Sequence, residues 1–170
     1  MIVTPIGVGI ARYPAIFAHL SRYQAALEKR WDKGKHWWEL RSCDYYPAFA
    51  QPKIVYPQIM VSPQFAYDDQ SIFTNQKCFI ITNVDAYLLG ILNSTSVWSL
   101  ITSASPPLRG GYSEPRKDLV LSLPIPDAPS SDRNAIADLV QHCLDARGVN
   151  CEEWEREIDE RVAVLYGLHE

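Results

Sequence analysis

Apolar residues recur every three or four positions in three parts of the chain, which is the spacing of one face of an α-helix. The pattern over residues 12–30 predicts a first helix. A denser apolar pattern over 85–105 predicts a buried helix or helix pair. Residues 134–147 and 152–166 predict two more helices, which a short turn would join into a helical hairpin.

Residues with known capping preferences stand at the ends of these segments. Asp85 precedes the second helical pattern and is expected to cap its first turn. Asn150 and Glu153 have the spacing of a capping box at the start of the last helix. Gly148 and Gly167 follow the two C-terminal patterns and are expected to end them.

Short runs rich in β-branched and aromatic residues predict strands between the helices. The first run spans 52–61 and contains Pro57, so we expect an edge, bulged or interrupted strand. Three strands over 64–83 would form an antiparallel meander, and a last short strand is expected over 119–126. The predicted fold class is therefore α+β, a small antiparallel sheet with packed helices and a C-terminal helical hairpin.

Charge divides the chain into two parts of opposite sign. Residues 127–170 carry 11 acids and 4 bases, a net −7, whereas residues 1–126 carry 12 bases and 9 acids, a net +3. A polyanion is attracted to the first part and repelled by the second. We therefore divide the chain into a domain over 1–126 and a C-terminal helical hairpin over 127–170, which packs on that domain or on a partner.

Composition narrows the cellular setting. No apolar run approaches the roughly 18 residues that a membrane-spanning helix needs, and the first residues lack the basic region of a secretory signal peptide. The expected location is the cytoplasm. The four cysteines show no CxxC spacing and are expected to be reduced.

Residues that could form a catalytic or cofactor site are few. Gly7 and Gly9 have a G-x-G spacing, but no strand pattern precedes them and the third glycine of a dinucleotide-binding or adenosylmethionine-binding turn is missing. Asp68 and Asp69 lack a third carboxylate and are expected to be turn residues. No histidine lies near a Ser, Cys or acid in the arrangement of a triad. We expect no catalytic site, metal or cofactor in this chain.

Two segments combine basic and aromatic side chains. Residues 33–41 contain the adjacent Trp37 and Trp38 among basic residues, and residues 108–117 combine Arg, Tyr and Lys with two glycines that let the backbone approach a ligand. Arginine suits guanine edges and phosphates, and tyrosine suits a sugar or base. The alternative is a protein-interaction module, in which the Trp/Tyr cluster and the helical hairpin bind another subunit.

An ordered set of motifs resembles the TaqI-like C-terminal specificity domain of adenine-specific DNA methyltransferases and fused restriction-modification enzymes. The set comprises YPAIFAHLSRYQAALEKRWDKGKHWWELR, QPKIVYPQI, YLLGILNSTSVWSLI, LRGGY, LSLPIP and IDERVAVLYGL. The resemblance covers nearly the whole chain. It implies that residues 1–126 form a DNA target recognition domain, while a separate methyltransferase domain flips and methylates the adenine.

The same resemblance implies a non-catalytic fragment of a larger type II restriction-modification enzyme. The chain lacks the Asn-Pro-Pro-aromatic motif of the catalytic domain. S-adenosylmethionine is therefore expected on the methyltransferase domain of the parent polypeptide, which could also carry an endonuclease. The expected partners are double-stranded DNA and that methyltransferase domain, with no membrane, and the C-terminal helices offer a surface for a homodimer.

The resemblance places DNA contacts on the basic and aromatic segments. We predict base or backbone readout by Arg109 and Tyr112. Phosphate contacts are predicted for five basic residues: Lys35, Arg41, Lys53, Arg116 and Lys117. One of Trp37 and Trp38 is expected to belong to the core that orients Arg41 and Lys53.

Overall fold

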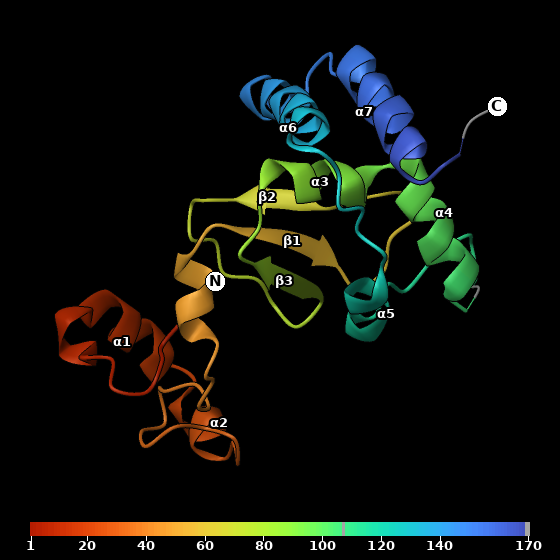
Figure 1. Ribbon diagram of the computed structural model, residues 1–170. Coiled ribbons are helices and arrows are strands. Elements are labelled where there is room, and N and C mark those ends of the chain that lie inside the picture. Colours follow the sequence, from red (N-terminus) through yellow and green to blue (C-terminus); the bar gives the residue numbers. More distant parts are fainter. Residues whose placement is uncertain (107, 169–170) are drawn as a thin grey trace. The chain divides into compact units, whose positions relative to one another are not determined.

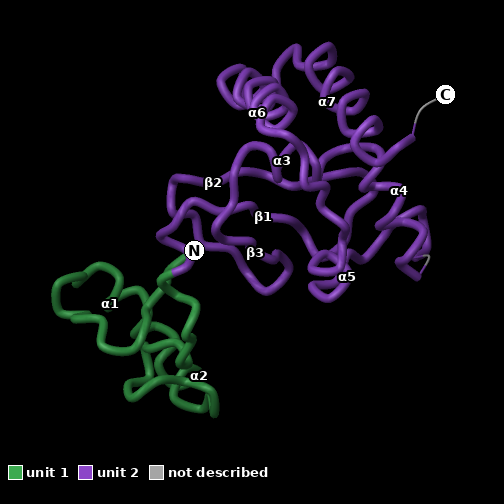
Figure 2. Tube along the Cα trace, in the orientation of Figure 1, with its two compact units in different colours: residues 1–47 green, residues 48–170 purple. Residues whose placement is uncertain are grey.

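The chain folds into two compact units, which Figure 2 shows in different colours. The computed structural model describes residues 1–106 and 108–168. Unit 1 is Met1–Pro47 and unit 2 is Ala48–Glu170. The functional division predicted at 126/127 falls inside unit 2 and stays a prediction.

Unit 1 contains three short helical segments, η1 (Ile10–Arg12), α1 (Pro14–Ser21) and α2 (Gln24–Glu28). Pro14 occupies the first turn of α1. The single continuous helix predicted over 12–30 is wrong, because the helix breaks after α1. At Tyr23 the backbone leaves helical geometry, with φ −113° and ψ 8°, and the Tyr23 N–H bonds to the carbonyl of Leu20 three residues earlier.

A buried carboxylate organises the rest of unit 1. Glu39 is 1% exposed, and its Oε1 and Oε2 accept hydrogen bonds from the N–H groups of Gly7, at 2.9 Å, and His36, at 3.0 Å. The bond from Gly7 is the main cause of a Glu39 pKa below its usual value, against the opposite effect of burial. Over residues 1–47, all of which the structure describes, only Thr4 and Glu39 are buried side chains.

Unit 2 contains a three-stranded antiparallel sheet in the order β2-β1-β3, formed by β1 (Lys53–Pro57), β2 (Ala66–Asp68) and β3 (Cys78–Thr82). η2 (Tyr46–Ala50) precedes β1. The α+β fold class is confirmed, but the predicted meander is wrong, because β1 lies in the centre of the sheet and residues 70–74 form no strand. Pro57 ends β1, where its missing N–H interrupts no further pairing.

A helix pair follows the sheet, as the apolar pattern over 85–105 predicts. The pair consists of α3 (Ala86–Asn93) and α4 (Thr95–Ala104). Asp85 caps α3 as expected, since its Oδ1 accepts from the N–H of Leu88 at 2.7 Å. Ser94 separates the two helices in an extended conformation and caps α4 through the N–H of Val97 at 3.2 Å.

The remaining helices are α5 (Lys117–Ser122), α6 (Ser130–Asp145) and α7 (Glu152–Leu165). The strand predicted over 119–126 is wrong, because its first residues belong to α5 and Pro124 ends regular structure. The two C-terminal helices are confirmed. Gly148 and Gly167 adopt φ +71° and +70° after them, as helix-ending glycines do. The capping box is not formed: Cys151 is the N-cap of α7, with no side-chain cap bond.

One apolar core joins the layers of unit 2. Figure 1 shows α6 and α7 side by side next to α3, and buried residues of the sheet, α3, α4 and both C-terminal helices belong to one cluster. Gly90 permits a close approach of α3 and α6, because a Cβ there would lie 2.8 Å from Cγ2 of Ile136. The N–H of Thr95 also bonds to Oδ1 of Asp159 at 2.8 Å. The hairpin is therefore an integral layer of unit 2.

Candidate nucleic-acid interface

Residues 108–117, here called the basic loop, connect α4 to α5 and are anchored on the segment that follows β1. Met60 and Ser113 exchange backbone hydrogen bonds of 3.0 and 2.9 Å in an isolated antiparallel bridge. Met60 is 1% exposed and Pro115 is fully buried. The N–H of Leu108 donates to the carbonyl of Tyr112 at 3.2 Å and closes the tip. The loop is therefore fixed at its base and projects only its tip.

The tip of the basic loop carries the side chains predicted to read DNA. Gly110 and Gly111 adopt φ +83° and +78°, which side chains rarely tolerate. Arg109 is exposed, and Tyr112 is 46% exposed. A Cβ on Gly110 would lie 3.3 Å from Cε2 of Tyr112, so the aromatic ring packs over this glycine. The structure thus brings Arg109 and Tyr112 together on one exposed turn.

A carboxylate holds the base of the loop in place. Glu114 accepts a hydrogen bond from Nε2 of Gln58 at 2.9 Å, and Nε of Arg116 lies 3.4 Å from its other oxygen. The bond from Gln58 is the main cause of a lowered Glu114 pKa, to which the charge of Arg116 also contributes. The Arg116 side chain remains 71% exposed, and Lys117, the first residue of α5, is also exposed. Both can reach a phosphate.

Lys77 is a basic residue that the sequence reasoning missed. It precedes β3, and its carbonyl accepts from the N–H of Gln58 at 2.7 Å, next to the pair of Pro57 and Cys78. Its charge lies close enough to Glu114 to help lower the pKa of that carboxyl. In the sequence, Lys77 is a single base in a turn. Its nearness to Glu114 becomes evident only when the pairing of β1 with β3 is known.

The structure corrects the prediction for Lys53. This side chain is fully buried, and its Nζ is ion-paired with Oδ2 of Asp68 and donates to the carbonyl of Phe49 at 2.9 Å. Burial raises the pKa of Asp68, but the bonds from Lys53 and from the N–H groups of Gln70 and Ile72 outweigh it and lower that pKa. An ammonium enclosed in this way does not contact a phosphate. Lys53 is a structural residue of the sheet.

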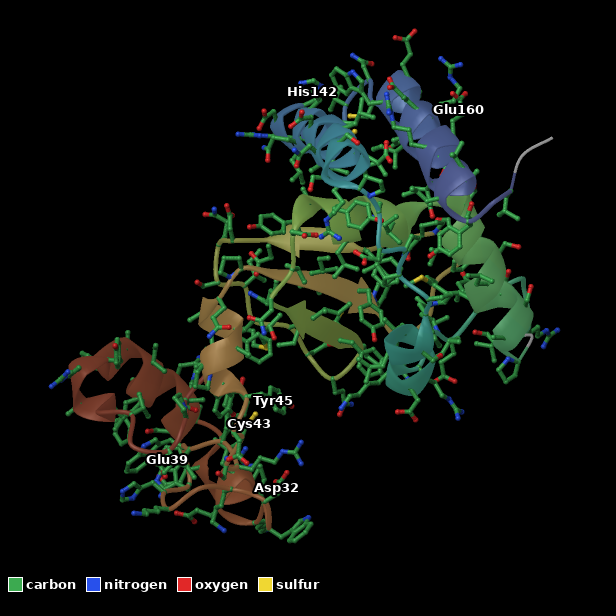
Figure 3. All side chains as sticks on the ribbon, viewed as in Figure 1. Asp32, Glu39, Cys43, Tyr45, His142 and Glu160 are labelled. Carbon is green, nitrogen blue, oxygen red and sulfur yellow. The ribbon has the colours of Figure 1, made fainter. Side chains whose placement is uncertain are left out.

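The other predicted contacts, Lys35 and Arg41, are exposed residues of unit 1. Arg41 lies beside Tyr45, where its charge opposes the rise in the Tyr45 pKa that a hydrogen bond with Cys43 causes. Figure 3 labels Cys43 and Tyr45 in unit 1. These two bases belong to a different unit from the basic loop.

The adjacent tryptophans form an aromatic cluster within unit 1. Both Trp37 and Trp38 are half-buried, and their ring centroids lie 5.7 and 5.8 Å from that of Phe17. The His36 ring stacks on Trp38 at 4.4 Å. The expectation of a tryptophan in one core that orients both Arg41 and Lys53 is wrong, because Lys53 has its own partners in unit 2.

An anchored, glycine-bent loop that exposes Arg, Tyr and Lys has the chemistry to bind a polyanion. Comparison with known protein families identifies the family of this chain. The model of the TaqI-like C-terminal specificity domain matches residues 6–125, and the chain belongs to this family. Such a domain serves target recognition in TaqI-like methyltransferases, which implies binding to DNA. A comparison with curated proteins finds no match.

Two features are absent from the described residues: a cluster of metal ligands and a membrane-spanning helix. Among residues 1–106 and 108–168, no group of His, Cys, Asp or Glu side chains is arranged to hold a metal ion. Asp68 uses its oxygens on Lys53 and on the N–H groups of Gln70 and Ile72, as a turn residue does. In the same described residues, no helix is both long and apolar enough to cross a membrane.

Proposed function

We propose that this chain binds double-stranded DNA and selects the target sequence for an adenine-N6 methyltransferase domain of the same parent polypeptide, as part of a restriction-modification enzyme. The chain itself is non-catalytic. The observation that carries the proposal is the basic loop, whose base is buried and hydrogen-bonded while its tip exposes Arg109 and Tyr112. A rigid base and an exposed tip are what sequence readout in a groove requires.

The roles of the loop residues follow from their exposure. Arg109 has the geometry for a bidentate contact with a guanine edge, and Tyr112 reaches a sugar or base beside it. Phosphate contacts fall to the exposed bases that flank the tip and to those of unit 1, which position the domain without reading sequence. These bases are Lys35, Arg41, Lys77, Arg116 and Lys117.

The methyl donor of such an enzyme, S-adenosylmethionine, does not fit the glycine segment of this chain. Gly7 lies in a turn closed by the Val8 N–H and the carbonyl of Pro5, and η1, a single 3-10 turn, follows. A nucleotide-binding glycine turn joins a strand directly to an α-helix. No strand precedes Gly7 in the described residues 1–6, and the first α-helix begins only at Pro14, after the η1 turn. We therefore assign the methyl donor to the methyltransferase domain. An endonuclease domain on the parent polypeptide belongs to the same proposal.

The acidic C-terminal hairpin is expected to face away from DNA. Residues 127–170 carry the net charge of −7, and ion pairs such as Arg161 with Glu157, at 2.6 Å, neutralise their few bases. Repulsion between this surface and phosphates orients the duplex toward the basic loop. The methyltransferase domain is the partner that this surface would meet.

The experiment is selection from a random duplex pool at low salt, followed by anisotropy titrations of the enriched sequences across a salt series. A short enriched motif and a steep loss of affinity with salt are expected, because phosphate contacts release counterions. Arg116→Ala should weaken binding to all sequences and reduce the salt slope by about one. A salt-independent affinity would contradict the proposal.

Arg156→Ala is the matched control for Arg116→Ala. The two arginines have side chains that are 70% and 71% exposed, and each has a glutamate partner, Glu160 and Glu114 respectively. Arg156 lies on the acidic helix α7, so its loss should leave DNA affinity unchanged. Equal losses for the two variants would point to a general charge effect in place of a site.

A second candidate function, protein interaction, is favoured by one observation. A groove of about 430 Å³ lies between the edge strand β2, α3 and the hairpin, with apolar walls that include Phe65, Leu89 and Ile158. A partner bound there would add salt-insensitive affinity, since apolar contacts are not screened. Retention of a methyltransferase domain by the chain at high salt, without DNA, would support this function. The homodimer through the C-terminal helices stays a prediction.

A further inference from the structure

Residues 29–35, here called the tryptophan turn, present the most exposed large apolar side chain of the described residues. Trp31 is 95% exposed. A covered tryptophan typically buries on the order of 150–250 Å², so a globular domain rarely leaves one in water. The exposure is specific to this position, because Trp37 and Trp38 in the same unit are half-buried in the aromatic cluster.

Side-chain hydrogen bonds from Arg30 and Lys33 hold the backbone on both sides of Trp31. Nη2 of Arg30 donates to the carbonyls of Trp37, at 3.0 Å, and Glu39, at 2.9 Å. Nζ of Lys33 donates to the carbonyl of Arg30 at 2.9 Å. These bonds fix the turn on unit 1, so the indole is a presented side chain and not part of a loose tail.

Gly34 secures the other end of the turn. A Cβ at this position would lie 2.7 Å from Cβ of Glu39 and 2.8 Å from Cγ1 of Ile6. The turn is therefore packed directly against the buried carboxylate. In Figure 3, Glu39 and Asp32, the residue after Trp31, are both labelled in unit 1, and Asp32 is exposed whereas Glu39 is buried.

The surroundings of Trp31 are positively charged. The tryptophan turn has four bases and one acid, a net +3, and unit 1 as a whole has 7 bases and 4 acids, also a net +3. Residues 48–126 have 5 of each and no net charge. The whole positive excess of residues 1–126 therefore lies in unit 1, away from the basic loop in sequence.

An exposed aromatic ring among bases matches nucleic acid better than protein. Aromatic rings pack on bases and sugars while lysines bind the phosphates beside them. Protein interfaces, in contrast, are depleted of charged residues, and of lysine above all, at their centres. In the tryptophan turn, Lys29 and Lys35 precede and follow Trp31 in the chain, and both are exposed.

We propose that the tryptophan turn is a second DNA contact, separate from the basic loop, in which the Trp31 indole packs on a sugar–base edge and Lys29 and Lys35 bind the adjacent phosphates. The inference rests on the proposed function. It assigns to unit 1 a sequence-tolerant grip on the duplex, because contacts with sugars and phosphates carry no sequence information. The basic loop keeps the sequence readout.

The test compares Trp31→Ala, Trp31→Phe and the control Tyr23→Ala in the full chain, by anisotropy with a fluorescein-labelled duplex of the selected sequence. Tyr23 is a 54% exposed aromatic of the same unit. We expect Trp31→Ala to weaken binding about 5-fold or more, as truncation of an interface tryptophan does, Trp31→Phe to lose less, and Tyr23→Ala to match the wild type. Circular dichroism should show all variants folded, because Trp31 supports no core.

Acrylamide quenching gives an independent readout. The Trp31→Phe variant removes this one tryptophan, so the difference between its quenching and that of the wild type reports the Trp31 ring. We expect the duplex to protect that ring, and Arg109→Ala to preserve the protection at saturating DNA. Protection together with the affinity loss supports the inference.

The outcomes separate the two proposals. If the wild type binds DNA and Arg116→Ala weakens it, while Trp31→Ala binds like the wild type and DNA does not protect the wild-type Trp31 ring from acrylamide, the tryptophan turn is no DNA contact and the proposed function stands. If the wild type binds no duplex at low salt, both fail. If Trp31→Ala instead loses only binding to a methyltransferase domain, the turn is a protein interface and the inference is overturned.

Discussion

Unit 1 and unit 2 are stabilised by different interactions. Unit 2 has an apolar core in which Ile54, Ile91 and Ile136 are completely buried. Unit 1 buries no apolar side chain fully, and hydrogen bonds to Glu39 and from Arg30 connect its segments. Apolar packing is non-directional and depends on volume, whereas a polar network depends on geometry and ionisation. The two units should therefore respond to different changes.

The largest expected effect concerns an exception to this difference, because unit 2 also depends on one buried polar pair. Lys53→Ala leaves Asp68 buried without its cation, and removal of one partner of a buried pair costs about 3–5 kcal/mol. Urea unfolding followed by circular dichroism measures the loss. Lys117→Ala, at an exposed position, is the control and should change stability by less than about 0.5 kcal/mol. Equal stabilities for the two variants would refute a structural role for Lys53.

A glycine in unit 1 tests how strongly this unit depends on the geometry around Glu39. Gly34→Ala should destabilise unit 1 by about 1–3 kcal/mol, the usual cost of overpacking, because its Cβ meets Glu39 at 2.7 Å. Hydrogen exchange of the Gly7 and His36 amides measures this local opening. Gly9→Ala is the matched control, since its Cβ would lie 3.7 Å from its nearest neighbour. Faster exchange in Gly9→Ala as well would mean that any added methyl disturbs the unit.

The two units are also expected to differ in DNA recognition. Arg109→Ala in the basic loop should lose about 1–3 kcal/mol of discrimination between the selected and a scrambled sequence. Lys35→Ala in unit 1 should weaken both sequences alike and reduce the salt slope by about one. Anisotropy with the two duplexes measures both effects. Equal losses on both sequences for Arg109→Ala would remove this residue from the readout.

The smallest expected effect is a response to pH. Hydrogen bonds lower the pKa of Glu39, so this carboxyl stabilises unit 1 above its unfolded pKa, about 4.3, and the stabilisation is lost as pH falls through the lower folded pKa. Limited proteolysis below that pH should open residues 1–47 while the core of unit 2 persists. Glu39→Gln should remove this pH dependence. Simultaneous opening of both units would show that Asp68, whose pKa is also lowered, dominates acid stability.

Local patterns predicted α3, α4, α6 and α7 of unit 2 well but not α5, because apolar spacing and caps such as Asp85 act within a few residues. The same reasoning failed where distant pairing decides the outcome. Lys53 looked like a surface base, but it lies opposite Asp68 in the register of β1 with β2. The sequence contains no signal for that register. The placement of Arg109 and Tyr112 on one exposed turn could be predicted, because a short turn keeps neighbouring residues together.

The same limit explains the errors in unit 1 and in the sheet order. The apolar spacing over 12–30 gave no sign of the break at Tyr23, since the competing three-residue bond depends on backbone geometry. The central place of β1 follows from the burial of Ile54 and Tyr56, at 0% and 2% exposure. Burial of this kind is set by the whole core.

The bridge between Met60 and Ser113 has a consequence for how this domain can change over evolution. It separates residues that hold the loop from residues that are exposed at its tip, and the two sets lie next to each other in the chain. Mutations within 109–112 alter the exposed tip without entering the core. If the tip reads DNA as proposed, a lineage can acquire a new target through a few codon changes, and an engineer can graft a different tip between Leu108 and Ser113 on the same scaffold.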